Sequence, residues 1–159
     1  MATTIDKFDS TGGFSVDKTT VVDELRNAKD LNTLEIKNSN YSDSRTTNYI
    51  LRGLNTSTLD LDGLGTQVPI LSNTINFITG HIIAVNAAGT VYSTKFETSL
   101  YCDASGNTTV QSSFQTVIKD DIPSGETWEV EPVGALNRFS YSTTRAGTTS
   151  TIKWIANTQ

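Results

Sequence analysis

The chain has 159 residues, the size of one domain or of one domain with a small appendage, and it needs no metal or disulfide staple to bury a core. Charged residues make up 18% of it, against about 25% in an average soluble domain, and Thr, Ser and Asn are abundant instead. The net charge of −5 is spread without a Lys or Arg cluster, and no apolar run approaches the length of a membrane span, so neither a nucleic acid partner nor membrane insertion is expected. Because β-branched Thr favours pleated surfaces, the composition predicts an all-β protein with a polar, weakly ionic surface.

The N-terminal part is predicted to be extended, with one short helix as an alternative. Residues 1–12, rich in Thr and Asp, are predicted to form a flexible arm. Thr20 can cap a short helix that has an acidic first turn and ends near Lys29, but Thr19–Val22 suits a strand equally well. Large apolar side chains are sparse over residues 13–66, so this part is interpreted as an attachment and oligomerisation segment.

Short strands separated by Gly, Asn and Ser turns follow along the rest of the chain. Such a pattern is typical of an antiparallel β-sandwich or barrel. Strands are predicted within residues 32–38, 48–54, 57–63, 74–85 (as two pieces around Gly80), 90–103, 108–120, 127–133, 137–144 and 151–157. Since Pro69 cannot donate to a central ladder, a boundary is placed near it, and residues 67–159 are predicted to form a jelly-roll-like β-sandwich domain.

The clearest strand is the stretch from Thr90 to Asp103, which alternates almost without a break. Its expected buried side consists of Tyr92, Thr94, Phe96, Thr98, Leu100 and Cys102. Cys102 is the single cysteine, so an intrachain disulfide framework is excluded and a buried, inert thiol is expected. Aromatic residues at alternating strand positions are expected to form the core.

The start of the sequence, MATTIDKFDSTGG, has no apolar run after a basic flank, so no signal peptide is expected. The composition is typical of extracellular proteins, yet neither an export signal nor a disulfide framework accompanies it. This combination indicates a virion component that folds in a cytosol and is released by lysis.

Four stretches carry a resemblance to a known family: NTINFITGHIIAVN, YSTKFETSL, PSGETWEV and TIKWIAN. From about Gln67 onward the chain resembles a module common in virion structural and tail-fibre proteins of tailed phages, especially those infecting marine and freshwater bacteria. In that family an Ile-Arg-Trp or Ile-Lys-Trp step followed by small residues closes the domain. The stretch DKTTVVDELRNAKDLNTLEIKNS resembles the part that precedes such modules. The resemblance brings no catalytic motif or cofactor, and it implies a structural role in a homo-oligomer, often a trimer.

Two candidate chemical sites involve His81 and a pair of aspartates. His81 has no Cys, His or carboxylate partner at ligand spacing, and no GxSxG elbow accompanies it, so a packed or edge histidine is preferred over a catalytic one. Asp60-Leu61-Asp62-Gly63 is a fragment of a calcium loop without the remaining ligands, and it is interpreted as outward carboxylates before a Gly turn. No metal is therefore expected.

The densest acidic cluster consists of Asp120, Asp121, Glu126, Glu129 and Glu131. Glu129 and Glu131 lie two apart on one predicted strand, and such neighbours are roughly 7 Å apart, a separation that does not exclude the carboxylate pair of a glycosidase. A solvated strand face is the preferred interpretation, and a carbohydrate-active enzyme is the third hypothesis.

Two tyrosines are candidates for surface binding. Tyr101 lies on the polar side of its strand and Tyr41 lies in an Asn-rich loop, so both are expected to be available for stacking on a sugar ring. The triplets at Asn40, Asn55 and Asn107 match glycosylation acceptors, but a chain rich in Asn, Ser and Thr produces them by chance.

The leading hypothesis from the sequence is a non-enzymatic structural protein of a bacteriophage virion, located on the particle surface as a capsid decoration protein or a short tail fibre. The expected partners are other virion proteins of the capsid or tail and two further copies in a homotrimer. The alternative is a β-sandwich module that binds a glycan or another host receptor.

Overall fold

The computed structural model describes the chain except for residues 1–13, 17–18, 23–27, 29–32, 42–43 and 63. The chain divides into two compact units, Met1–Asn32 and Thr33–Gln159. Each unit holds antiparallel strands, and no helix occurs among the described residues. The prediction of an all-β chain is confirmed.

The first unit contains a small antiparallel ribbon of two strands, β1 (Phe14–Val16) and β2 (Thr19–Val22). The register shifts between Phe14 and Ser15, so only three residue pairs join the strands. Where the sequence left helix and strand open, Thr19–Val22 is a strand. The remainder of the alternative helix and the arm over residues 1–12 fall largely or wholly outside the described residues.

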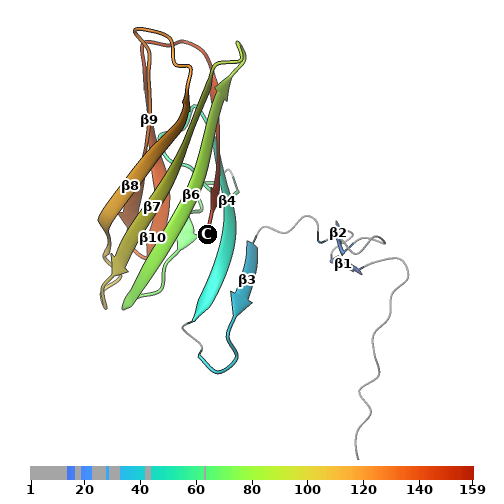
Figure 1. Ribbon diagram of the computed structural model, residues 1–159. Helices are drawn as coiled ribbons and strands as arrows, with labels where there is room; N and C mark the ends of the chain where they lie inside the picture. The colour runs from blue at the N-terminus through green and yellow to red at the C-terminus, as the bar shows by residue number, and fades with distance from the viewer. Residues whose placement is uncertain (1–13, 17–18, 23–27, 29–32, 42–43, 63) are drawn as a thin grey trace, which may run out of the picture. The chain divides into compact units, whose positions relative to one another are not determined.

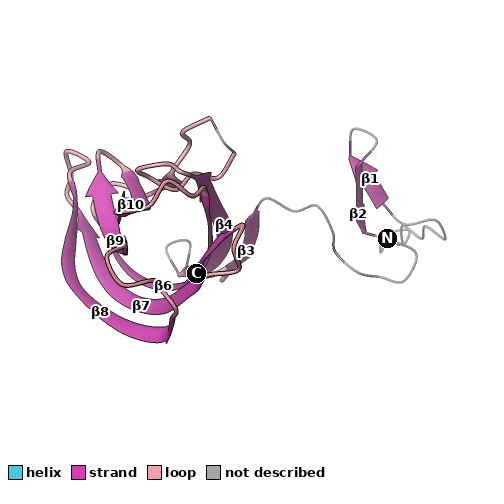
Figure 2. Cartoon of the chain, turned by 90° about the horizontal axis from the view of Figure 1, so that it is seen from above, coloured by secondary structure: helices cyan, strands magenta, loops and turns pink. Residues whose placement is uncertain are grey.

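The second unit is a β-sandwich of a six-stranded and a three-stranded sheet (Figure 1). The larger sheet has the order β3-β4-β11-β6-β7-β8, and the smaller has the order β5-β10-β9. The strand bounds are β3 Thr33–Lys37, β4 Arg45–Leu54, β5 Val68–Pro69, β6 Thr74–Asn86, β7 Val91–Cys102, β8 Thr108–Asp120, β9 Thr127–Ala135, β10 Arg138–Ala146 and β11 Ile152–Thr158. The view from above shows the larger sheet curving, with β9 and β10 on its concave side (Figure 2). The predicted sandwich architecture is confirmed.

The core lies between the sheets and follows the period-two pattern of the strands. The six residues predicted to form the buried side of β7 are all buried, from Tyr92 to Cys102. They meet β10 of the smaller sheet, where the ring of Tyr141 lies 6.0 Å from Phe96 and 5.1 Å from Phe139, centroid to centroid. Trp154 of β11 is also buried, so the TIKWIAN stretch provides a central strand of the sheet.

Gly80 allows β6 to run as one strand where the sequence predicted two pieces. A Cβ atom at Gly80 would lie 1.9 Å from the hydroxyl oxygen of Tyr141. The glycine is therefore a gap on the inner face that accommodates a core tyrosine, and the ladder to β7 passes through it without a register shift. Burial raises the pKa of Tyr141 to about 12.

The expected strand over residues 57–63 is wrong in length. The described residues of this stretch make two isolated bridges, Arg52 to Asp60 and Thr58 to Ser142. It crosses between the two sheets and places Leu59 in the core with no exposed surface. The crossing requires a change of direction, which a continuous strand would not provide.

The expected boundary near Gln67 differs from the division of the structure, which falls between Asn32 and Thr33. β4 precedes Gln67 in sequence, yet it pairs with β11 over six residues and buries Leu51 in the common core. Pro69 lies in β5, at the edge of the smaller sheet, where a missing N–H donor breaks no central ladder.

Candidate functional site

The outer face of the six-stranded sheet, the side that points away from the smaller sheet, is rich in exposed apolar side chains. Because residues alternate along each strand, the neighbours of buried core residues point outward. Ten large apolar side chains lie on this outer face and are 39% to 84% exposed: Leu34, Ile36, Ile50, Leu54, Ile75, Phe77, Ile83, Tyr101, Phe114 and Ile155. The expectation that strand aromatics form the core is wrong for Phe77 and Phe114.

The register of the strands brings several of these side chains together. Ile83 of β6 lies directly opposite Ile155 of β11. Ile75 lies opposite Tyr101 of β7, and Phe77, which is 84% exposed, is the next outward residue along β6. An aromatic side chain has a surface of roughly 150–250 Å², so Phe77 and Phe114 alone expose on the order of 300 Å². This exposed area is comparable to the largest apolar patch of a typical monomer, about 300–600 Å², and such patches often mark interaction sites.

Polar side chains cross the middle of the outer face. The Lys95 ammonium lies 2.7 Å from a carboxylate oxygen of Glu97. The hydrogen bond and the charge of Lys95 hold the pKa of Glu97 below its usual value. His81 lies exposed beside Lys95 in the sheet, and it belongs to no group of three His, Cys, Asp or Glu side chains among the described residues.

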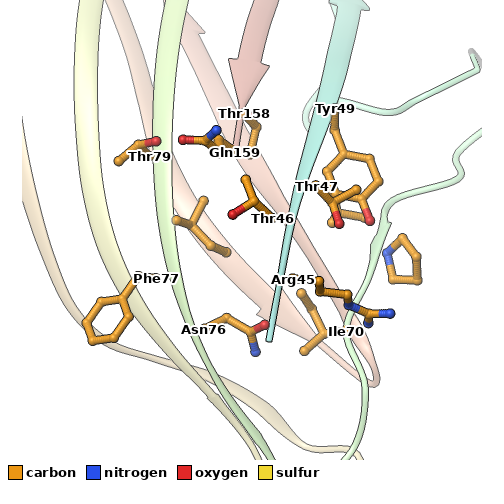
Figure 3. Close-up of a pocket in the computed structure, with 13 residues that line it drawn as sticks. Arg45, Thr46, Thr47, Tyr49, Ile70, Asn76, Phe77, Thr79, Thr158 and Gln159 are labelled. Atoms are coloured by element: carbon orange, nitrogen blue, oxygen red, sulfur yellow. The ribbon is translucent and has the colours of Figure 1, made fainter. Parts of the chain in front are cut away.

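A slot opens in the six-stranded sheet where β11 ends. β4 and β6 lie on either side of β11, and both extend past Thr158, the last residue of β11. Between them lies a cavity of about 290 Å³ lined by the first half of β4, the first half of β6 and Thr158 (Figure 3). Because β11 lies between β4 and β6, these two strands are two strand spacings apart, about 9–10 Å. The slot between them past the end of β11 therefore has the width of one further strand.

Among the described residues, no strand pairs with the stretches of β4 and β6 that form the two walls of this slot. On β6, the N–H and C=O of Thr79 bond to Gln159, so by strand alternation the backbone groups of Phe77 and Ile75 point to the same side. On β4, the backbone of Arg52 bonds to Asp60 on the opposite edge, so the backbone groups of Thr47 and Arg45 point into the slot. The two walls therefore present the donors and acceptors that would continue the ladder of β11.

The side chains around the slot change from apolar to polar along its length. Near Thr158 the lining includes Ile78 and Val68, which are 6% and 4% exposed. Farther along, Asn76 faces Arg45, which forms an exposed 3.4 Å ion pair with Glu35 on β3. No sequence pattern marked this slot, because it depends on where β11 stops relative to its two neighbours.

The Asp60 and Asp62 carboxylates hold a loop. Asp62 accepts hydrogen bonds from the N–H of Leu64 at 2.8 Å and of Thr66 at 3.3 Å, and Asp60 accepts one from the N–H of Gly65 at 3.2 Å. Hydrogen bonds from Thr66 and Leu64 lower the pKa of Asp62. Among the described residues, no three His, Cys, Asp or Glu side chains are grouped so as to hold a metal ion.

The structure divides the acidic cluster between β9 and the residues that precede it. Glu126 accepts a 3.0 Å hydrogen bond from the indole N–H of Trp128. Glu129 and Glu131 are exposed on the side of β9 opposite buried Trp128 and Val130, as predicted. The arrangement orients the core Trp128 through Glu126 and leaves the other two carboxylates on a solvated strand face.

Both candidate tyrosines are accessible, and they lie on different parts of the fold. Tyr41 is 66% exposed in the connection from β3 to β4. Tyr101 is 39% exposed on the outer face beside Ile75, so it belongs to the apolar surface described above. Cys102 is fully buried, as predicted, and its sulfur accepts a hydrogen bond from the Thr108 hydroxyl at 3.4 Å.

A comparison with protein-family models found no match, and a comparison with curated protein sequences found none either. Within the described part of the chain, no helix has the length and apolar character needed to cross a bilayer.

Proposed function

We propose that this chain is a non-enzymatic structural protein of a bacteriophage virion that assembles as a homo-oligomer, most simply a trimer, on the particle surface. The observation that carries the assembly is the outer face, where one sheet presents large apolar side chains on the side opposite its core. Covering such a face removes apolar area from water, and ten partly exposed large side chains supply the area of a standard interface, about 800 Å² per partner. The virion location rests on the resemblance of the four sequence stretches, and both a capsid decoration protein and a short tail fibre fit it.

Light scattering of the full-length protein tests the assembly. A trimer has three times the 17.2 kDa mass of the chain. Ile83→Asp places a charge opposite Ile155 at the centre of the outer face, so we expect this variant to lose the oligomer while circular dichroism still reports a folded sandwich. Ser124→Asp, in an exposed turn, is the matched control and should leave the oligomer intact. A monomeric wild-type protein at micromolar concentration contradicts the proposal.

The virion location has its own test. Mass spectrometry of purified particles from a phage that encodes this chain should detect it in stoichiometric amounts. Its consistent absence from such particles contradicts the proposed location, whatever its oligomeric state.

Binding of a glycan or another host receptor is the second candidate function. It is favoured by the exposed ring of Tyr101 beside Ile75 and by the exposed ring of Tyr41. Binding to a glycan array that is weakened by Tyr41→Ala with the oligomer intact, or by Tyr101→Ala in a protein that stays monomeric, would support it. Wild-type protein that binds no glycan or host cell surface would remove this candidate.

A further inference from the structure

The strand β8 forms one edge of the six-stranded sheet and is its outermost strand in the view from above (Figure 2). It is 13 residues long and pairs with β7 on one side. Among the described residues, no strand pairs with its other side. Every residue from Gln111 to Asp120 is exposed, whichever face its side chain points to. A long exposed edge of this kind is a template for the addition of a further strand.

The backbone of β8 directs its free hydrogen-bonding groups away from β7 at alternate residues. The C=O of Thr116 accepts a 3.0 Å hydrogen bond from the Thr94 hydroxyl, so it points toward β7. Because successive residues of a strand point their backbone groups to opposite sides, the N–H and C=O of Ser113 and Gln115 point to the free edge. The pairing with β7 is regular over residues 112–117, between two register shifts. Within this segment the free donors and acceptors alternate without interruption.

The side chains of this segment define what can pair with it. No proline and no charged residue occurs from Thr108 to Ile118, although such residues commonly protect a strand edge. The bulges at the two register shifts are the protection that β8 has, and they confine regular pairing to the segment between them. Phe114, 66% exposed, lies near the middle of this segment on the outer face, with Ser112 and Thr116 on either side of it. An uncharged segment with an apolar centre and small polar flanks is therefore the best complement, and β8 itself has this pattern.

We propose that the β8 edges of two copies of this chain pair antiparallel about a two-fold axis at Phe114. Ser113 of each copy then exchanges backbone hydrogen bonds with Gln115 of the other. Phe114 lies opposite Phe114 of the second copy, and aromatic cross-strand pairs stabilise a sheet. Ser112 lies opposite Thr116, so hydroxyl meets hydroxyl and no like charges face each other. A shift of the register would leave Phe114 opposite another residue of the segment.

The size of this contact makes it a weak, lateral one. It spans residues 112–116 of each copy, which is far less than the roughly 20–30 residues a side of a standard interface. Copies that are held close together on a particle have a high effective concentration, which populates such a contact. The pairing would place the outer faces of two copies side by side, since Phe114 belongs to the apolar set of that face. It goes beyond the proposed function, because it needs a second copy but no covered outer face.

Disulfide trapping in full-length chains tests the proposal. Phe114 and its counterpart would form a non-hydrogen-bonded pair with Cα atoms about 4.5 Å apart, within the range that a disulfide accepts. Phe114→Cys chains are oxidised at high protein concentration, and digestion identifies the linked peptides. Cys102 is buried, so the link is read at the introduced cysteine.

Ser112→Cys and Thr116→Cys are matched controls, because both positions are exposed on the same face of the same strand. In the proposed register, the two Ser112 residues of a pair lie four residues apart along the strands, about 13 Å, and so do the two Thr116 residues. We expect the 114–114 link to exceed the 112–112 and 116–116 links by roughly tenfold or more. Mixed Ser112→Cys and Thr116→Cys chains should form a 112–116 link at a yield similar to that of the 114–114 link.

A proline tests the backbone hydrogen bonds of the pair. Gln115→Pro removes an N–H that points to the free edge, which an edge strand tolerates, and should lower the 114–114 link to the level of the controls. Gln115→Ala keeps the N–H and should preserve the link. Circular dichroism checks that both variants are folded. A link that is undiminished in folded Gln115→Pro contradicts strand pairing.

The Ile83→Asp chain separates this inference from the proposed function. We expect the 114–114 link to persist in this chain, in which the outer face is no longer covered. A link that disappears with Ile83→Asp would belong to the outer-face assembly and would overturn the edge pairing. An oligomer by light scattering with equal links at positions 112, 114 and 116, or with none, overturns the edge pairing and leaves the oligomer standing. A wild-type protein that scatters as a monomer yet shows the 114–114 preference would contradict the proposed assembly and support the edge pairing.

Discussion

Both faces of the six-stranded sheet carry large apolar side chains, but the smaller sheet covers only one of them. On β6, Ile78 and Ile82 are buried against the smaller sheet, whereas Phe77 and Ile83 on the same strand are more than half exposed. The difference arises because β5, β10 and β9 cover one side of the larger sheet alone. A strand that is apolar on both sides is typical of a sheet covered on both faces, which is consistent with the proposed assembly through the outer face.

The comparison is tested most strongly by truncating one phenylalanine on each face. Phe96 is 3% exposed and lies beside Tyr141 in the core. Phe96→Ala should lower the free energy of unfolding by about 3–5 kcal/mol, because a cavity replaces the core ring. Phe77→Ala, on the outer face, should change it by less than about 0.5 kcal/mol. Urea unfolding at a concentration where the chain is monomeric measures both, so that assembly does not contribute.

Equal losses from the two substitutions would contradict the comparison. They would mean that Phe77 is buried within the monomer. If the loss of unfolding free energy in Phe77→Ala instead grows with protein concentration, the outer face is covered by assembly. The two faces would then differ in what covers them, the smaller sheet on one side and another copy on the other.

Much of the fold could be predicted from strand periodicity, because one clean pattern specifies both the strand and its buried side. The Thr90–Asp103 stretch is the clearest case: the observed strand is Val91–Cys102, and all its predicted inner residues are buried. Period two alone does not decide which face is covered when both are apolar, as on β6. There the aromatic Phe77 was expected in the core and lies outside.

Features that depend on two distant segments could not be predicted locally. Gly80 looks like a strand break in the sequence, and its role follows only from the position of Tyr141, 61 residues later in the printed sequence. The slot can be recognised only by comparing where β4, β6 and β11 begin and end. The accessible positions of Tyr41 and Tyr101 were expected, because a polar loop and the polar side of an alternating strand are local signals.

An intermediate effect is expected from filling the gap on the inner face. Gly80→Ala brings a Cβ to within 1.9 Å of the Tyr141 hydroxyl, so β6 or the ring must shift, and overpacking of this kind costs about 1–3 kcal/mol. Thermal unfolding of the single variants and of Gly80→Ala with Tyr141→Phe completes a double-mutant cycle. The double variant should recover part of the loss, since the nearest clashing atom is gone. Strict additivity of the two single losses would show that Gly80 is needed for another reason.

The smallest effect is expected from the ion pair in the middle of the outer face. Lys95 lowers the pKa of Glu97, so the folded state binds the Glu97 proton less tightly than the unfolded state, where the pKa is near 4.5. The stabilisation from the ion pair is therefore present above the unfolded-state pKa of Glu97 and is lost as the pH falls through its folded-state pKa. Because the pair is exposed to water in the single chain, Lys95→Gln should lower the melting temperature only slightly at pH 7.

In dilute solution this small difference between the wild type and Lys95→Gln should close as the pH falls through the lowered pKa of Glu97, since protonated Glu97 no longer distinguishes the two proteins. Melting curves from pH 7 to pH 3 measure it, and a difference that persists undiminished at pH 3 would show that Lys95 acts through packing of its alkyl chain instead. At high concentration a covered outer face excludes water from the pair. Removing Lys95 would then leave a buried, unpaired Glu97, so the difference at pH 7 should grow with concentration, in contrast to that of Phe96→Ala on the inner face.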